Sequence, residues 1–589
     1  MFFSAYLGHP EHESRWRDAL HRHAAWLGLT AHPFACSLSD GRVFEYGWVS
    51  LRPPDTDALV REGGGNLTVI PLDTLTRAEA LAQNTPRGFE TTAIRMDVSL
   101  LSGEVRVAVP VLTVEQFYHA NTGGDWVFGN DLRLMLRWAG LQLDERAIYS
   151  IFQFSFTPPP LTVSRTVRRI PPGSGFVLRP GQAAGAVERF FRASDLNLQR
   201  GTESAEELLQ EALDGVLARV PAGAAMHFSG GLDSGLIAAR LSAVGGRDTR
   251  LQNFSHGQGD IFRDVAPAMA AHLGMTCEQV EWLPSEIPGT LQDLARDYTF
   301  PFADSATIPT RMLIGAMDRW DEPPSMLLEG SGGGSLFDWG IRYDGWRRVY
   351  AVPLPLRRAA AALYRLGLWR SDARAVRPIA VLNASAQLPM LHAAAGSHAT
   401  LNSLAYRVPP EVWEGLRGTL NERLTALSDG MEPRDQVTML ALLRNTLHMS
   451  TQRTFDAMRR RGIAALYPML EPAVVQAGLA MTWDEKCPGG DLRAPLKRLM
   501  ARSVPREWVY WPVRAFHFPF LDTFTQAAVR ALVGDVVLSP RNPLMALCRR
   551  DGVEQVFRRA EAGRPMNHGA QRFVWALTSL SLWLSQLDS

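Results

Sequence analysis

The sequence predicts two fold classes in one chain: a layered α+β domain over residues 1–200, then an α/β domain with a parallel sheet over residues 201–589. Up to about residue 200, short apolar runs lie between Gly, Pro and Asp residues, a pattern typical of strands and turns. From Gly201 on, helical and strand-like segments alternate, which indicates a parallel sheet. With 589 residues, 46% hydrophobic and 21% charged, the chain can form both cores.

Charge and cysteine content exclude several functional classes. A net charge of +1 gives no reason to expect nucleic-acid or membrane binding. The four cysteines form no CxxC pair, so neither a metal site nor a disulfide framework is predicted, and a reducing cytoplasm fits. Met1–Leu7 reads as a first strand rather than a signal peptide. Val574–Leu587 is predicted as a C-terminal helix docked on the core, because it is shorter than the ~20 apolar residues of a membrane span.

The first domain is predicted to contain alternating strands around one long helix. The helix is expected at Glu11–Leu27. The strands are expected at Val43–Val49, Leu67–Ile70, Val105–Val114 and Trp126–Phe128. This order favours sheets in layers.

The second domain is predicted to begin with a helix over Ser204–Val220. Strands are then expected at 224–228, 251–255, 277–283 and 325–328, with a helix at 264–273. Because the carboxyl ends of parallel strands meet at one edge of a sheet, ligands bind there. The loops Ser229–Ser234, Asn253–Gly257 and Gly330–Ser335 are therefore expected to converge on one pocket.

The segment Met226–Gly235 carries the strongest chemical signal. It reads as a strand, a turn through Ser229-Gly230-Gly231, and a helix beginning near Leu232. Glycines allow the backbone to approach a ligand, and the amides of such a turn with a helix N-terminus form an anion site. Asp233 would repel phosphates unless a cation such as Mg²⁺ lay between them. Neither a Walker A loop nor a dinucleotide fingerprint is present.

This order resembles the signature of the PP-loop ATP pyrophosphatases, and within them the asparagine-synthetase-type synthetases. In the first domain, Gln116–His119, Trp126–Asp131 and Arg169–Gly173 resemble segments of that family's glutaminase domain. The resemblance implies an Ntn-hydrolase-like fold with αββα layers. The family's nucleophile is an N-terminal cysteine, whereas this chain has Phe2, so the fold is expected to remain without the hydrolase.

The resemblance extends, with gaps, from residue 1 to about 525. Tyr467–Glu471, Asp491–Lys497 and Trp511–Pro519 resemble later segments of the synthetase domain, and residues about 340–443 are expected to form a helical insert. ATP and Mg²⁺ are the implied cofactors. The implied ligand contacts are Ser229, Gly230, Gly231, Asp233 and Ser234 for pyrophosphate, Asn253, Phe254 and Ser255 for adenine, and Gly330, Ser331 and Gly332 in the third loop. Asp233 is the implied magnesium ligand, and the implied catalytic residues are Asp233, Ser229 and Arg514.

The chain departs from the family pattern in the acidic and basic partners of the nucleotide loop. Gly334 and Ser335 stand where the family has an Asp that helps to hold magnesium and a Glu. Val513 stands where the family has a Lys, and the neighbouring Arg514 is either its replacement or a surface residue. Three acids could replace the missing magnesium ligand or be ordinary structural acids: Asp338, Glu329 and Asp304.

A third departure bears on the substrate. Ala464 and Leu466 replace a Glu and an Arg that handle a small amino acid and ammonia in asparagine synthetases. Apolar residues there favour a larger or more apolar acyl substrate.

Family members without the N-terminal cysteine include β-lactam or carbapenam synthetases and the lasso-peptide macrolactam synthetases (cyclases). Ser331, where the β-lactam group has Tyr, and the long insert favour a cyclase. Its expected partners are a precursor peptide and a leader peptidase, and no nucleic acid. Two alternatives stay open: a β-lactam-forming or ammonia-using amide synthetase, and a catalytically weak member that binds peptide or nucleotide.

Overall fold

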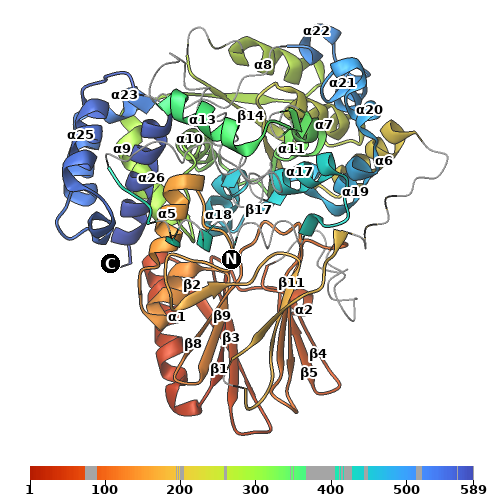
Figure 1. Ribbon diagram of the computed structural model, residues 1–589. Coiled ribbons are helices and arrows are strands. Elements are labelled where there is room, and N and C mark those ends of the chain that lie inside the picture. The colour runs from red at the N-terminus through yellow and green to blue at the C-terminus, as the bar shows by residue number, and fades with distance from the viewer. Residues whose placement is uncertain are drawn as a thin grey trace.

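The computed structural model of the chain contains two antiparallel sheets and one parallel sheet (Figure 1). It describes the chain apart from residues 73–88, 183, 194–195, 197, 199–203, 258–259, 261, 342, 345–346, 349–350, 366–404, 410, 413–414, 417–418, 420–426, 444–448, 512–519, 567 and 588–589.

The first antiparallel sheet is built around the N-terminal strand β1 (Phe2–Gly8), which pairs with β3 (Val43–Ser50) on one side and β9 (Asp125–Gly129) on the other. The strand order is β10-β8-β9-β1-β3-β2. The remaining strands of this sheet are β2 (Thr30–Ser37), β8 (Tyr118–Thr122) and β10 (Val167–Arg169). Seven consecutive buried residues in β1 place this strand in the interior of the domain, as its apolar sequence predicts.

The second antiparallel sheet has the order β12-β11-β7-β6-β5-β4. Its strands are β4 (Val60–Gly63), β5 (Asn66–Val69), β6 (Arg95–Ser99), β7 (Val105–Val109), β11 (Ser174–Leu178) and β12 (Ala186–Arg189). The strand predicted at 105–114 is therefore shorter than expected. It ends before Pro110, whose ring nitrogen cannot donate to a ladder.

The two sheets pack face to face, and helices cover the far side of the first sheet. Phe3, Phe44, Trp48 and Val107 belong to the shared core between the sheets. Helices α1 (Glu13–Leu27) and α4 (Leu132–Ala139) lie on the other face. The described residues thus show three of the four layers of the predicted αββα order. They show no second helix layer on the outer face of β6 and β7, where partly exposed side chains alternate with buried ones.

The third sheet is parallel and has the order β15-β14-β13-β16-β17. Its strands are β13 (Ala225–His227), β14 (Arg250–Ser255), β15 (Cys277–Glu281), β16 (Met326–Glu329) and β17 (Ala464–Leu466). The first four confirm the predicted strands. The fifth, β17, is a strand that the sequence does not predict: these three residues pair with Met326–Leu328 and complete the sheet edge.

Helices surround the parallel sheet. Ser204 caps α6 (Ala205–Leu217) through a capping box with Glu207, which explains why the helix begins there. The other helices around the sheet are α7 (Leu232–Ala243), α8 (Phe262–His272), α9 (Ile287–Asp297), α10 (Thr307–Met317), α11 (Gly333–Phe337), α18 (Gln452–Arg460), α19 (Pro472–Ala480) and α21 (Ala494–Met500).

Much of the predicted insert at about 340–443 lies outside the described residues. Its described helices include α13 (Leu354–Arg365) and α17 (Pro433–Ala441). The remaining described α-helices of the chain are α2 (Thr56–Leu59), α5 (Glu145–Phe154), α20 (Trp483–Lys486), α22 (Arg506–Val509), α23 (Phe520–Phe524), α24 (Ala527–Leu532), α25 (Arg550–Glu561) and α26 (His568–Ser585).

The last helix confirms the predicted core-docked segment. Val574, Trp575, Leu577 and Trp583 of α26 are buried in the core that also contains residues of α1 and α9. Among the helices of the described residues, none is long and apolar enough to cross a membrane.

Candidate functional site

The candidate site lies where the order of the parallel sheet reverses. From β13 the chain continues to β14 on one side, and the later strand β16 pairs on the other side. In open α/β sheets, such a switch point leaves a crevice at the carboxyl ends of the strands. The loops after these three strands therefore meet at one edge, as the sequence predicts.

The loop after β13 is a tight turn locked by two serines. Gly230 has φ +69°, a conformation that favours glycine, and a Cβ there would lie 3.1 Å from Ala266 Cβ. Ser229 Oγ lies 3.0 Å from Ser234 Oγ, and it accepts a hydrogen bond from the Gly231 amide at 3.2 Å. The Ser229 amide donates to Ser234 Oγ at 3.2 Å. This turn leads directly into α7, so backbone amides and a helix N-terminus face the same point, the arrangement that binds phosphate.

The other two predicted loops touch this turn. A Cβ on Gly330 would lie 3.2 Å from the Ser234 amide nitrogen, so glycine lets the loop after β16 reach the start of α7. Asn253 of β14 is buried, and its Nδ2 donates to the carbonyl of Phe228 at 3.0 Å. Gly332 has φ +117° and lies against Leu470. The structure thus places Asn253 and Gly330 against the turn, whereas Phe254 and Ser255 contact Trp282: the Phe254 and Trp282 ring centres lie 6.2 Å apart, and the Trp282 amide donates to the Ser255 carbonyl at 2.9 Å.

Asp233, the acid of the turn, is held by an arginine that the sequence analysis did not assign to the site. Arg493 Nη1 donates to both Asp233 carboxylate oxygens at 3.1 and 3.3 Å. Its Nε and Nη2 donate to Asp338 Oδ2 at 2.9 and 2.6 Å. Burial raises the pKa of Asp233, and Arg493 acts against this by favouring the charged carboxylate. One guanidinium therefore joins two carboxylates next to the nucleotide loop.

Two glycines of the loop after β16 make room for this trio. A Cβ on Gly333 would lie 2.5 Å from Asp233 Oδ1, and a Cβ on Gly334 would lie 2.9 Å from Arg493 Nη2. Both distances are below 3.0 Å, so a side chain at either position would require the carboxylate or the guanidinium to shift.

Magnesium, which the family resemblance implies, would find its donors on Asp233 and Asp338, and Asp338 Oδ1 is buried without a hydrogen-bond partner among the described residues. Both oxygens of Asp233 accept hydrogen bonds from a cationic side chain, and Gly334 supplies no second carboxylate. Of the three possible substitutes, Asp338 is bound to the same Arg493, and Glu329 and Asp304 pair with Arg453. In the described part of the chain, no three His, Cys, Asp or Glu residues gather as metal ligands. The described residues thus offer two acids, Asp233 and Asp338, on either side of Arg493, and the role of Asp233 as a magnesium ligand stays a prediction.

A second charged cluster lies at the end of β16. Glu329 accepts hydrogen bonds from Ser331 Oγ at 2.6 Å, from Arg453 Nη2 at 3.3 Å and from Thr454. Arg453 also lies 3.7 Å from Asp304. Burial acts to lower the pKa of Arg453, but the two carboxylates outweigh it, so the pKa is raised. The predicted Ser331 is thus oriented by an acid that is itself paired.

His227, the last residue of β13, borders this cluster. Burial lowers the pKa of His227 to about 4, and Nε2 has no hydrogen-bond partner among the described residues. The imidazole is therefore neutral at pH 7, so Arg453 is the cation that offsets Glu329 and Asp304.

Of the predicted site residues, only Arg514 lies outside the described residues, together with Val513. The charged residue at the site that sequence reasoning missed is Arg493, although it belongs to the segment Asp491–Lys497. Nothing in the spacing of that segment relates it to Asp233, 260 positions earlier.

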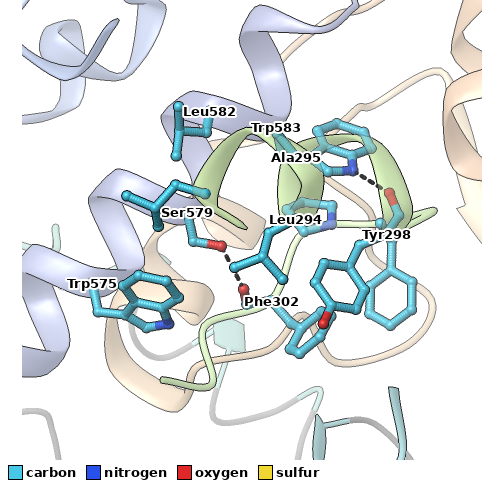
Figure 2. A pocket seen from close by; sticks show the side chains of 11 residues that line it. Leu294, Ala295, Tyr298, Phe302, Trp575, Ser579, Leu582 and Trp583 are labelled. Atoms are coloured by element: carbon cyan, nitrogen blue, oxygen red, sulfur yellow. Dashed lines mark hydrogen bonds between the residues drawn. The ribbon is translucent and has the colours of Figure 1, made fainter. Parts of the chain in front are cut away.

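A small cavity between α9 and α26 is too small for a substrate (Figure 2). It encloses about 10 Å³, which is room for roughly one water molecule. Trp583 Nε1 donates to the Tyr298 carbonyl and Ser579 Oγ to the Phe302 carbonyl, both at 2.9 Å. These bonds fix the C-terminal helix to the segment after α9, so the cavity is a packing gap.

Two solved structures are only distantly similar to the chain. One is described as the allosteric regulatory enzyme of purine biosynthesis, with 9% identity, a TM-score of 0.21, and coverage of 47% of this chain and 65% of that chain. Glutamine phosphoribosylpyrophosphate amidotransferase from B. subtilis has 10% identity and the same TM-score, and covers 48% of this chain and 66% of its own. At such a TM-score the likeness decides nothing about the fold.

Sequence comparisons are more informative. Asparagine synthetase [glutamine-hydrolyzing] 1 of Bacillus subtilis (strain 168) is 27% identical over 256 residues, 41% of this chain and 38% of that protein. A putative asparagine synthetase of Mycobacterium bovis is 27% identical over 225 residues, 37% of this chain and 32% of its own length. The matches thus span less than two fifths of these relatives. The family model named Asparagine synthase matches residues 204–585, well over half of the chain. The chain belongs to the asparagine synthase family.

Proposed function

We propose that this chain forms an amide bond at the expense of ATP, within a ribosomal precursor peptide, and so closes a macrolactam. An Asp or Glu carboxylate of the peptide attacks the α-phosphate of ATP, and pyrophosphate leaves. The N-terminal amine of the same peptide then attacks the acyl carbon, AMP leaves and the amine loses a proton. The peptide thereby loses one water. Holding both groups in one folded peptide replaces a bimolecular step by an intramolecular one.

The observation that carries the proposal is the identity and burial of the residue that begins β1. In glutamine-hydrolysing relatives, the resemblance places a cysteine nucleophile at this strand. Here Phe2 is buried, with 1% of its surface exposed, and its ring contacts Arg459. The described cysteines lie elsewhere: Cys36 is on β2, and Cys277, Cys487 and Cys548 come after residue 201. We infer an Ntn-like layered domain that supplies no ammonia, so the amine comes from the substrate.

The nucleotide site supports the first half of the reaction. Amides and hydroxyls of Ser229–Ser234, at the N-terminus of α7, would hold the departing pyrophosphate. The loops after β14 and β16 close the site on both sides, where adenine and the acyl group would bind. A leader peptidase would prepare the free N-terminal amine.

Exchange of labelled pyrophosphate into ATP tests this proposal. We expect exchange only with a precursor peptide that contains an Asp or Glu acceptor, and a cyclised product lighter by one water by mass spectrometry. Exchange with free aspartate would instead indicate an asparagine-synthetase-like activity. ATP binding without any exchange would favour a catalytically weak family member. The ion pair between Asp233 and Arg493 is the observation that favours this alternative.

Asp233→Ala should abolish exchange and leave the fold intact. The matched control is Asp551→Ala, which removes an exposed acid from the first turn of another helix, α25, far from the site in sequence. Full exchange in Asp233→Ala would refute the site assignment.

A further inference from the structure

We propose that Glu329, Asp304 and His227 form a binding site for the ammonium group of a peptide N terminus, at the end of β16. The identity of this ligand as the attacking amine of the substrate rests on the proposed function. The site itself follows from the position of the cluster, its charge and its free hydrogen-bond acceptors.

The cluster lies next to the nucleotide loop. Glu329 is the last residue of β16, and the residue after it, Gly330, reaches the Ser234 amide. Arg453, near the start of α18, joins two acids: its Nη2 donates to Glu329 at 3.3 Å, and its Nη1 lies 3.7 Å from Oδ2 of Asp304, which precedes α10. A group bound by these acids would therefore lie beside the crevice of the proposed acyl group.

The cluster has one positive charge too few. Glu329 and Asp304 carry two negative charges, and Arg453 carries one positive charge, so the three residues leave a net charge of −1. Their side chains are only 12–15% exposed. The neighbouring His227 adds no charge at pH 7, because burial lowers its pKa to about 4. A largely desolvated negative charge is unfavourable without a partner, so the cluster favours a bound cation.

Both carboxylates can accept further hydrogen bonds. Asp304 Oδ1 accepts from the Ala306 amide at 3.0 Å. Asp304 Oδ2 accepts none from the described residues, since Arg453 Nη1 is too distant for a hydrogen bond. Glu329 already accepts from three donors, and a carboxylate offers about four acceptor sites. Each acid therefore has at least one free acceptor site.

His227 supplies a third acceptor. It pairs with Glu329 in the parallel sheet, so the two side chains leave the same face of strands that lie about 4.8 Å apart. His227 Nε2 is buried and has no hydrogen-bond partner among the described residues. Gln252, the next residue across the sheet, is fully buried, and its Oε1 likewise lacks a partner in the described part of the chain. Buried acceptors without donors favour a ligand that brings its own N–H groups.

An ammonium group matches these requirements. It carries one positive charge and three N–H donors, and Asp304, Glu329 and His227 offer three acceptors. A neutral imidazole accepts at Nε2 when its proton is on Nδ1. Magnesium matches the cluster less well, because it prefers six oxygen ligands and this set contains an imidazole nitrogen and a guanidinium.

Thermal unfolding of the full chain with glycinamide tests the site without peptide or ATP. At pH 7 glycinamide carries the ammonium of a peptide N terminus, whereas N-acetylglycinamide does not. At millimolar concentrations and equal ionic strength, we expect glycinamide to raise the Tm by about 1–2 °C and N-acetylglycinamide to have no effect. Asp304→Asn keeps an acceptor for the Ala306 amide and should abolish the rise. Asp551→Asn, at an exposed acid of α25, is the control and should retain it.

Glu329→Gln is the second variant if Asp304→Asn does not fold. It also removes one negative charge, keeps an oxygen that can accept from Ser331, and should abolish the glycinamide effect. With a peptide that supports pyrophosphate exchange, either variant should lower the ratio of cyclisation rate to exchange rate about 10- to 100-fold. Exchange does not use the amine, and a charge-assisted hydrogen bond to it is lost.

Three results would overturn the inference: no rise in Tm of the wild type with glycinamide, an equal rise with N-acetylglycinamide, or an unchanged rise in Asp304→Asn and Glu329→Gln. A failure of the proposed function is distinguishable from these. A chain that responds to glycinamide, but exchanges pyrophosphate with no peptide, supports the ammonium site and contradicts the macrolactam reaction.

Discussion

The guanidinium of Arg459, in helix α18, lies 4.6 Å from the ring centre of Phe2, the first residue of β1. Arg459 Nε also donates to the carbonyl of Met1 at 3.1 Å, and the guanidinium lies 3.7 Å from Asp456. A buried arginine of the parallel-sheet half thus holds the start of the first antiparallel sheet. Figure 1 shows the helix that carries it, α18, beside the N-terminus. The two halves of the chain are joined at this contact.

Phe2→Ala should therefore destabilise the whole chain. Removing a buried aromatic side chain costs about 3–5 kcal/mol, and here Arg459 also loses its ring contact. Chemical denaturation followed by tryptophan fluorescence measures the loss. Leu101→Ala is the control, since Leu101 is 71% exposed. Equal stability of the two variants would contradict the role given to Phe2.

Gly333→Ala should reduce activity far more than stability. Its Cβ would lie 2.5 Å from Asp233 Oδ1, so the carboxylate must move away from Arg493. We expect a loss of at least about tenfold in pyrophosphate exchange, the equivalent of about 1.4 kcal/mol. Gly215→Ala, in α6, is the matched control, because a Cβ there meets nothing within 4 Å. Normal exchange in Gly333→Ala would mean that Asp233 does not need this position.

Arg453→Leu should be strongly destabilising. It leaves Glu329 and Asp304 without their shared cation, and removing one partner of a buried ion pair costs about 3–5 kcal/mol. Thermal denaturation is the measurement, and adding Glu329→Gln should restore part of the loss. Arg550→Leu breaks an exposed pair with Glu554 and should change the free energy of unfolding by less than about 1 kcal/mol. Similar effects of the two leucine variants would argue against a buried cluster.

The stability of the chain should fall as the pH is lowered from about 6.5 to about 4, in part because of His119. Burial first, and Arg168 second, lower the pKa of His119 from 6.5 to about 4. In this window the unfolded chain binds the proton and the folded chain does not, so the free energy of unfolding rises with pH. The contribution reaches at most about 3 kcal/mol.

His119→Phe should reduce this slope and keep the ring stack, since the imidazole centre lies 4.3 Å from that of Phe176. Denaturation curves across the same pH range measure the difference from the wild type. The control is His21→Phe, which changes an exposed histidine of α1. An unchanged slope in His119→Phe would show that His119 titrates normally.

Much of the fold could be predicted because its signals are local. β13, the turn at Gly230 and α7 follow from a few consecutive residues, and the capping box at Ser204 marks the start of α6. β17 was missed because three residues of a sheet edge carry no periodicity of their own. Its pairing with β16 supplies the information that its sequence lacks.

The nucleotide loop at the edge of a parallel sheet was determined by the sequence itself, since turn geometry and strand order are encoded in neighbouring residues. Only the tertiary structure decided which groups surround Asp233. Packing of α21 on α7 brings Arg493 from 260 residues away, and the glycines at 333 and 334 leave the space it fills. The chemistry of the loop therefore depends on a long-range packing contact, for which no local pattern exists.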